Sequence, residues 1–300
     1  MPPPALDLPR ASFLPWLAFA ACCLIWGSTW IAHKWALADF TPLGLATIRF
    51  TSGGVLCLLI ARISGEAWVR RQDLRALILA GLMLSGVANV LTSWSLLHIP
   101  SGVGAVLQAP IPVWFALMTL RSDPLRRSGW VAVFLGFFGV GLVMWPGDTN
   151  AIDPLAAVVC TLTAAGWSWA SLYQRNHVRS GGLFGNAGLQ MLFSSVFGLL
   201  LTPTLGGYTY GHGISSGAWI ATAYLVIGGS CIAFASYLYL VKVWHPARAG
   251  SFAYINPVIA VLLGWVFASE ALTPQLLVGM GVILVAVAVL QYATRVTAPK

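Results

Sequence analysis

The sequence predicts an all-α membrane protein of ten transmembrane helices, arranged as two inverted five-helix repeats. Three observations predict this. Apolar residues make up 58% of the chain, charged residues only 8%, and the mean hydropathy is +0.83, which leaves too little polar surface to cover a soluble globule. Ten apolar stretches each approach the roughly 20 residues that a helix needs to cross a bilayer. A motif near the N-terminus returns, altered, in the sixth stretch.

The ten stretches follow one another with short connections. Because unpaired backbone groups are costly in lipid, runs of this length predict helices rather than barrel strands. In chain order the predicted spans are 14–36, 43–63, 74–97, 101–120, 129–146, 154–174, 184–203, 218–241, 247–268 and 274–294. The first span is too long for the apolar core of a signal peptide and ends in His33 and Lys34 without a cleavage site, so we expect it to be retained.

An internal repeat relates the two halves. The first span carries Trp-Gly-Ser-Thr-Trp at residues 26–30, and the sixth carries Gly-Trp-Ser-Trp at residues 166–169. Aligning the glycines superposes Trp30 on Trp169, and Pro-Val pairs recur at 112–113 and 257–258 in the fourth and ninth spans. Since five spans is an odd number, the second copy must enter the membrane from the other side. We therefore expect repeats at 1–147 and 148–300, an arrangement typical of secondary transporters with a site near the midplane.

Basic residues lie on one side of the predicted membrane. If the N-terminus is cytoplasmic, the tails and even-numbered loops hold all 16 Lys and Arg residues except Lys34 and Arg49. The odd-numbered loops hold Asp39, Asp148, Asp153 and Glu270. The positive-inside rule thus predicts a multi-pass protein of a cell membrane, the inner membrane in a bacterium, with both termini cytoplasmic. Topology also explains the net charge of +8, so we expect no nucleic-acid partner.

Several function classes find no support in the sequence. The five cysteines all lie inside predicted spans and match no metal or CxxC redox spacing, so they are interpreted as small buried residues. No Walker sequence suggests hydrolysis of ATP. An intramembrane enzyme would need a nucleophile and a base at depth, and His33 has neither a carboxylate nor a second histidine at motif spacing. The sequence predicts no enzymatic activity, metal or cofactor.

Several motifs together resemble a known family. The motif at 26–30, the Arg49-Phe50 pair in the second span, the helix-embedded Pro-Val pairs and the two five-helix halves resemble the drug/metabolite transporter superfamily, in its EamA-type ten-helix exporter branch. The resemblance covers roughly residues 14–294 and is greatest to YddG-type exporters of aromatic and other neutral amino acids. It implies a basket around a central cavity, with spans one to four and six to nine near the cavity. Relatives also carry sugars, nucleotide sugars or small drugs, so the substrate stays open.

Helical spacing groups polar and aromatic residues on faces that we expect to line such a cavity, because deep polar side chains are costly against lipid. Tryptophans on these faces offer flat apolar surface to a ligand. The predicted substrate-binding residues are Trp26, Thr29, Trp30 and His33 in the first span, Asn89 and Thr92 in the third, Trp169 and Tyr173 in the sixth and Gln190 in the seventh. The alternative is that the polar members only join helices, at about 0.6 kcal/mol per contact.

Pro112 and Pro257 are predicted to kink the fourth and ninth spans. Neither can donate to the carbonyl four residues earlier, so each kink frees an acceptor at mid-membrane depth that a substrate ammonium can use. Alternatively, the kinks only curve the wall of the basket. Gln108, Tyr254 and Asn256 lie nearby and complete the predicted contacts.

Glycines without deep polar residues mark spans five and ten as packing elements. They are Gly136, Gly139, Gly141, Gly279 and Gly281. Small residues of this kind pack helices closely either within one basket or between protomers. Both a monomer and a homo-oligomer therefore remain open.

The charges constrain the mechanism. No Asp or Glu falls inside a predicted span, and the only clearly intramembrane ionisable residues are Arg49 and His33, the latter near the outer end. Since proton relays use a buried carboxylate or histidine, facilitated diffusion by alternating access fits better. Arg49 either meets a substrate carboxylate or anchors the helix to backbone carbonyls. The sequence thus predicts a non-ATP exporter of neutral and aromatic amino acids. The alternatives are a proton-coupled exporter of drugs, sugars or nucleotide sugars, and a channel, which the tryptophan-rich faces disfavour.

Overall fold

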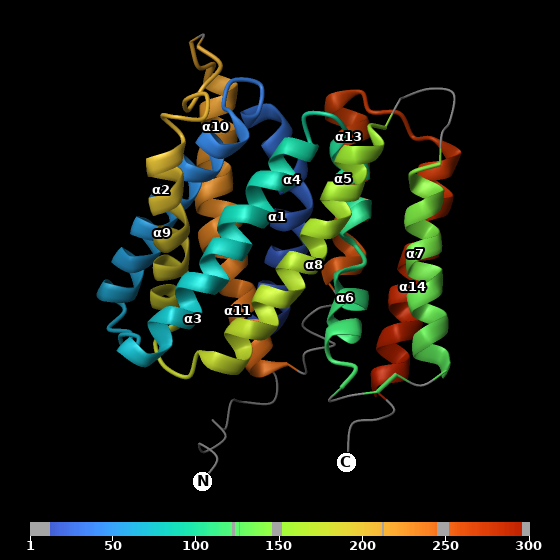
Figure 1. Cartoon of the computed structure of the whole chain (residues 1–300), viewed down its shortest axis with the longest axis horizontal. Coiled ribbons are helices and arrows are strands. Elements are labelled where there is room, and N and C mark those ends of the chain that lie inside the picture. The colour runs from blue at the N-terminus through green and yellow to red at the C-terminus, as the bar shows by residue number, and fades with distance from the viewer. Residues whose placement is uncertain are drawn as a thin grey trace.

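The computed structural model describes residues 13–121, 124–125, 127–145, 152–211, 213–244 and 252–295. In that part of the chain, ten helical rods stand side by side and cross the molecule in alternating directions (Figure 1). Within the described residues the rods match the ten predicted spans to within a few residues, which confirms the all-α class, and residues 146 and 247–251 of the predicted spans lie outside the described residues. Helix α1 begins and α14 ends at the same end of the bundle, the lower end in Figure 1. We call this end the terminal face and the other end the opposite face.

The first half contains five rods, two of them interrupted. The third rod changes helix type midway, and the fourth breaks at Ala109 and Pro110. The elements are α1 (Leu14–Ala36), α2 (Pro42–Ile63), α3 (Arg71–Gly81) with the π-helix η1 (Leu82–Ala88) and α4 (Asn89–Ser95), α5 (Ser101–Gln108) with α6 (Ile111–Met118), and α7 (Arg127–Val143).

The second half repeats this order with its own interruption in the third rod. The elements are α8 (Pro154–His177), α9 (Leu183–Leu201), α10 (Ser216–Tyr224) with the π-helix η2 (Leu225–Ala233) and α11 (Phe234–Val243), α13 (Phe252–Ala268) and α14 (Pro274–Arg295). Local sequence sets several helix starts. Thr41, Asp153 and Ser215 each cap the amide three residues on, and α2, α8 and α14 begin with proline, which is well suited to a first turn.

The rods are suited to a bilayer. Seven described segments are long and apolar enough to cross a membrane, and α7 and the segments 255–268 and 274–290 are shorter apolar helices. Large apolar side chains such as Phe134 (71% exposed), Leu200 (68%) and Ile220 (69%) face outward. Exposed apolar surface on this scale is the mark of a lipid-facing wall.

Two close helix pairs flank the bundle. Helix α7 lies along α14 at one side, and α2 lies along α9 at the other (Figure 1). Glycines make both contacts close, since a side chain on Gly139 would approach the carbonyl oxygen of Gly279 to 3.0 Å and one on Gly188 that of Gly54 to 2.9 Å. The predicted packing role of spans five and ten is visible here as α7 against α14 within one chain. Helix α9 also packs against α3 and η1.

The largest buried apolar cluster seals the half of the bundle nearer the opposite face. It joins the end of α1, the α4–α5 connection and the starts of α8 and α10, through residues such as Leu37, Phe40, Ile99, Ala156 and Ala218. Among the described residues, the other buried apolar clusters are smaller. The bundle is therefore sealed by packing in the half nearer the opposite face.

Candidate functional site

A cavity of about 710 Å³ lies at the centre of the bundle, with walls from both halves of the chain. Its lining reaches Thr119, Arg175 and Val178 at the terminal-face ends of α6 and α8. Near the opposite face it ends around Trp30 and His33. The cavity is thus approached from the terminal face.

Aromatic rings form one wall. The Trp26 ring packs edge-on against Trp167 at 6.4 Å between centroids, and contacts Phe252 at 5.0 Å and Tyr237 at 5.4 Å. Its indole nitrogen donates to the carbonyl oxygen of Gly229 in η2 at 3.1 Å. One tryptophan therefore joins α1 to α8, α11 and α13, and presents its rigid apolar surface to the cavity.

A polar cluster lies across the cavity where α4, α5 and α8 meet. The side-chain nitrogen of Gln108 donates to the hydroxyls of Thr92 at 2.8 Å and Thr163 at 2.7 Å, which also contact each other at 3.0 Å. Such a cluster costs little to bury because its members satisfy one another. It provides fixed polar groups in an otherwise apolar wall.

A buried cation lies in the wall near the closed end. Arg49 of α2 is 6% exposed, and its guanidinium contacts the Ser230 hydroxyl in η2 at 2.9 Å and Nε2 of His33 in α1 at 3.0 Å. Because a guanidinium can only donate, His33 must accept through an unprotonated Nε2. The anchor interpretation expects Arg49 to bond to backbone carbonyls. Among the described residues it makes no such bond, and its partners are the side chains of Ser230 and His33.

Most predicted site residues come together around this cavity. Those that line it are Trp26, Thr29, Trp30, His33, Asn89, Thr92, Gln108, Pro112, Asn256 and Pro257. The Asn256 amide, turned with its nitrogen toward α1, donates to the Cys23 carbonyl oxygen at 3.1 Å. The side chain of Tyr254 lies outside the described residues. Whether these residues contact a substrate stays a prediction.

The expectation that Trp169 and Tyr173 line the cavity is not met. Trp169 is 41% exposed and stacks on Tyr173 at 5.2 Å, on a face of α8 turned away from the cavity. The cavity face of this helix carries Trp167 instead, two residues earlier and therefore about 200° round the helix. The sequence carried a signal for this face, because Thr163, Ser171 and Gln174 are spaced so that they lie on the same side of the helix as Trp167.

Gln190 also lies away from the cavity. It is 1% exposed, in α9, where Gly81 of α3 packs against its backbone, and neither amide atom has a hydrogen-bond partner among the described residues. The reason is that α9 packs against α2, α3 and η1, and the Gln190 side of the seventh span meets α3 rather than the cavity. The resemblance placed this span near the cavity, and here the structure differs.

The proline predictions have different outcomes in the two halves. The fourth rod breaks at Ala109–Pro110, just before Pro112, and the Ser168 hydroxyl of α8 lies 3.2 Å from the Ile111 carbonyl oxygen beside the break. Helix α13 runs without interruption through Pro257. Only the first proline pair thus interrupts its helix, because Pro110 and Pro112 act together there.

Two π-helices mark features that the sequence did not reveal. They occupy the third rod of each half, η1 at Leu82–Ala88 and η2 at Leu225–Ala233. η1 contributes Leu84 and Ala88 to the cavity wall, and η2 contributes Ser230 to the Arg49 cluster. π-Helical turns within α-helices are frequent at functional sites.

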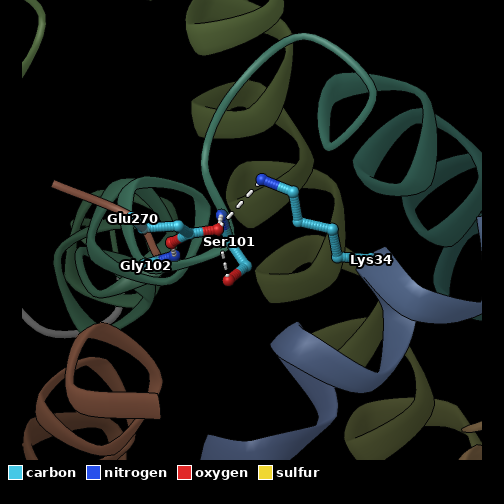
Figure 2. A network of polar contacts seen from close by, with 4 residues as sticks. All are labelled: Lys34, Ser101, Gly102 and Glu270. Carbon is cyan, nitrogen blue, oxygen red and sulfur yellow. Dashed lines mark hydrogen bonds and ion pairs between the residues drawn. The ribbon is translucent and has the colours of Figure 1, made fainter. Parts of the chain in front are cut away.

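A charged cluster closes the opposite face (Figure 2). The Glu270 carboxylate, between α13 and α14, accepts from the Ser101 amide at 2.6 Å, the Ser101 hydroxyl at 2.8 Å, the Gly102 amide at 2.9 Å and the Lys34 ammonium at 3.0 Å. Burial by itself raises the pKa of this carboxyl, but these donors outweigh burial and hold the pKa below its usual 4.5. We call this cluster the Glu270 clasp. It ties α1, α5 and the α13–α14 connection together at the end where the cavity is closed.

Every other described carboxylate is also engaged at a helix start or a loop, away from the cavity. Acceptors there satisfy amides that have no partner within a helix. The pairs are Glu66 with the amides of Leu183 and Gly185, Asp73 with Ser180, Asp39 with Ser215 and Asp153 with Ala156. Among the described residues, the cavity is thus lined by the cations Arg49 and Arg175 and by no carboxylate.

Known proteins resemble the chain over most of its length. It is 30% identical over 272 residues to the uncharacterized inner membrane transporter YedA of Escherichia coli K12, covering 90% of this chain and 88% of that protein. It is 24% identical to Protein PecM of Dickeya dadantii, covering 91% of each chain. A solved crystal structure with 21% sequence identity matches 93% of this chain and 98% of its own with a TM-score of 0.67, which supports the fold.

A family model assigns both halves. The model of the EamA-like transporter family matches residues 14–145 and again residues 154–292. Each match spans the five rods of one half, with the boundary between them ahead of α8. The chain is a multi-pass membrane transporter that belongs to the EamA-like transporter family.

Proposed function

We propose that this transporter exports small metabolites, neutral and aromatic amino acids in particular, by alternating access and without ATP or enzymatic chemistry. The observation that carries the proposal is the cavity itself. It is large enough for one small molecule, presents tryptophan rings beside polar groups, extends to one face and is closed at the other. Kinship with YddG-type exporters is part of this proposal.

The orientation is also proposed. The terminal face is the cytoplasmic face, because it collects the loops and tails that carry nearly all Lys and Arg residues. Of these, Arg10, Arg126, Arg248 and Lys300 lie outside the described residues, as does Asp148 on the other side. With this orientation the cavity faces inward, as an exporter must do to load its substrate.

The two halves are proposed to be inverted repeats, 1–147 and 148–300. The double match of the family model and the recurrence of a π-helix in the third rod of each half support this division. Inverted halves allow the same rods to open alternately to either side. The Glu270 clasp argues against an open channel.

A counterflow screen tests the function. Liposomes that contain only this protein are loaded with unlabelled amino acids, sugars, nucleotide sugars or amine drugs, and the entry of a trace of each labelled compound is followed. We expect saturable exchange of neutral and aromatic amino acids. Exchange restricted to sugars or cationic drugs would reject the proposed substrate class, and unsaturable flux would indicate a channel.

Trp30→Ala is expected to weaken transport of a large aromatic substrate by about two- to tenfold, because the lost stacking surface is worth roughly 0.5 to 1.5 kcal/mol. A small substrate such as alanine should be affected less. The measurement is the half-saturation concentration in counterflow. Trp169→Ala is the matched control, since this indole lies outside the cavity wall and is 41% exposed. Equal losses in both variants, with folded protein, would remove Trp30 from the site.

His33→Gln is expected to keep most of the downhill flux, and a pH gradient should not drive accumulation of a neutral amino acid. His33 accepts a bond from Arg49, so a protonated imidazole would lose this contact and bring two cations together. Glutamine also offers an oxygen acceptor. The measurement is uptake into liposomes with and without an imposed gradient. Proton-driven accumulation that disappears in the variant would instead support the proton-coupled alternative.

A further inference from the structure

Arg49 combines three properties that are rarely found together. It is a permanent cation, it is 6% exposed, and it lies in the wall of a cavity. Removing an ion of this size from water costs several kcal/mol unless an opposite charge or strong acceptors replace the water. A guanidinium at this position therefore needs an anion or strong hydrogen-bond acceptors beside it.

Among the described residues, Arg49 has only neutral partners. Of the five N–H donors of the guanidinium, one meets the Ser230 hydroxyl and one meets His33, both of which are uncharged in these contacts. The ring of Phe50 lies 5.0 Å from the guanidinium carbon. All carboxylates in the described part of the chain are engaged elsewhere, and the remaining ones, Asp7, Asp123 and Asp148, fall outside every predicted span.

The surroundings hold the guanidinium in place while leaving room beside it. Ser230 and His33 approach it from η2 and α1, two helices that Trp26 also joins through its bond to Gly229. Glycine at 229 matters here, because a side chain on it would come within 3.1 Å of the Nη2 atom. The neighbours therefore position the Arg49 guanidinium but do not neutralise its charge.

We propose that Arg49, positioned by His33 and Ser230, forms a subsite for the carboxylate of the transported molecule. A planar carboxylate can accept two parallel bonds from a guanidinium, a geometry that favours arginine over lysine. The apolar part of the ligand then lies against the tryptophan wall around Trp26 and Trp30. With no described carboxylate in the lining, the cavity selects anions and zwitterions over purely cationic drugs.

The subsite deepens the proposed function and rests on it for the statement that its ligand is transported. Its test therefore uses binding, which requires no transport. Purified protein in detergent is heated with increasing 3-phenylpropionate or with its uncharged amide, 3-phenylpropanamide, and apparent affinities are taken from the rise in melting temperature. The two probes have the same ring and chain, so their ratio isolates the carboxylate.

We expect the wild-type protein to bind the acid about tenfold or more tightly than the amide. Arg49→Met should bring this ratio close to one. Arg175→Met is the matched control, since it removes the other lining cation at the terminal face and should leave most of the preference. If Arg49→Met does not fold, Arg49→Lys should lower the ratio while keeping the charge. A wild-type protein stabilised equally by both probes, or by neither, overturns the subsite.

Transport is measured separately with the same compounds by counterflow. A clear preference for the acid in binding, abolished in Arg49→Met, supports the subsite even if no amino acid exchanges, and in that case only the proposed function fails. Exchange of phenylalanine and of phenylalaninamide at equal rates, in wild-type and Arg49→Met alike, would overturn the subsite while the transport function stands.

Discussion

Glu270→Gln is expected to open the opposite face of the protein. The glutamine side chain has nearly the same shape, but the Ser101 amide donates to Oε1 and the Gly102 amide to Oε2, so its NH₂ group must face one of these two donors. Hydrogen bonds to a charged group are worth about 1.5 to 3 kcal/mol each, so a loss of about 2 kcal/mol shifts the closed–open equilibrium roughly 30-fold. With the proposed alternating-access mechanism and orientation, this shift favours the outward-open state.

A buried reporter measures this opening. Val103 of α5 is 4% exposed and belongs to the apolar seal behind the clasp, so Val103→Cys provides a thiol that is reachable only after opening. The described native cysteines are buried and provide a low background. A membrane-impermeant maleimide should label the reporter much faster in the Glu270→Gln background. Unchanged labelling in folded protein would mean that the clasp does not hold the closed state.

Lys34→Met distinguishes the contribution of the Lys34–Glu270 ion pair from that of the Glu270 bonds to the start of α5. The Lys34 side chain is 37% exposed, and a partly exposed ion pair contributes at most about 1 kcal/mol. We therefore expect a much smaller increase in labelling than with Glu270→Gln. An equal effect would show that the ion pair, rather than capping of α5, closes this face.

Acid on the opposite face should act like the Glu270→Gln substitution. Because the clasp lowers the pKa of Glu270, its stabilisation is fully present above the usual value of about 4.5 and is lost as the pH falls through the lower pKa of the closed state. Between pH 5 and 8 the clasp should be insensitive to pH. Reporter labelling is measured from pH 8 down to pH 3.5 and divided at each pH by the labelling of denatured protein, because the maleimide reaction itself slows as the thiolate is protonated.

Gly279→Leu is expected to prevent α14 from packing on α7. A side chain at 279 would meet Val143 and lie 2.9 Å from the carbonyl oxygen of Gly139, a backbone atom that cannot move aside without separating the helices. Overpacking at such a contact costs about 1 to 3 kcal/mol. We expect a cost near the upper end of this range, because glycine has no side chain and leucine adds four carbon atoms. Samples are heated and then run on size exclusion, and the temperature at which half of the monomer peak is lost should fall sharply.

Gly281→Leu is the matched control for this substitution. It lies two residues further along the same helix, and nothing lies within 4 Å of a side chain built there. Its stability should stay within about 0.5 kcal/mol of the wild type. Similar losses in the two variants would mean that helix propensity or lipid contact, rather than the α7–α14 contact, limits stability.

The sequence by itself determined the helices, their number and most of their limits. These depend on local properties: an apolar run must match the thickness of the bilayer, and caps such as Asp153 before Pro154 start the helix without help from distant residues. The cavity-lining faces of the first and third spans also followed from spacing. Polar groups such as Thr92 have no other low-cost place in lipid.

Only the tertiary structure decided which way the remaining helices turn and what meets across the centre. An aromatic ring is tolerated both in lipid and in a cavity, so Trp167 and Trp169 could not be told apart until α8 packed. Gln190 lies outside the cavity because it packs against Gly81 of α3, and Arg49 meets Ser230, 181 residues away in sequence, because α2 packs against the π-helix η2. Hydropathy and spacing describe one helix at a time, whereas rotation and helix type result from packing between helices.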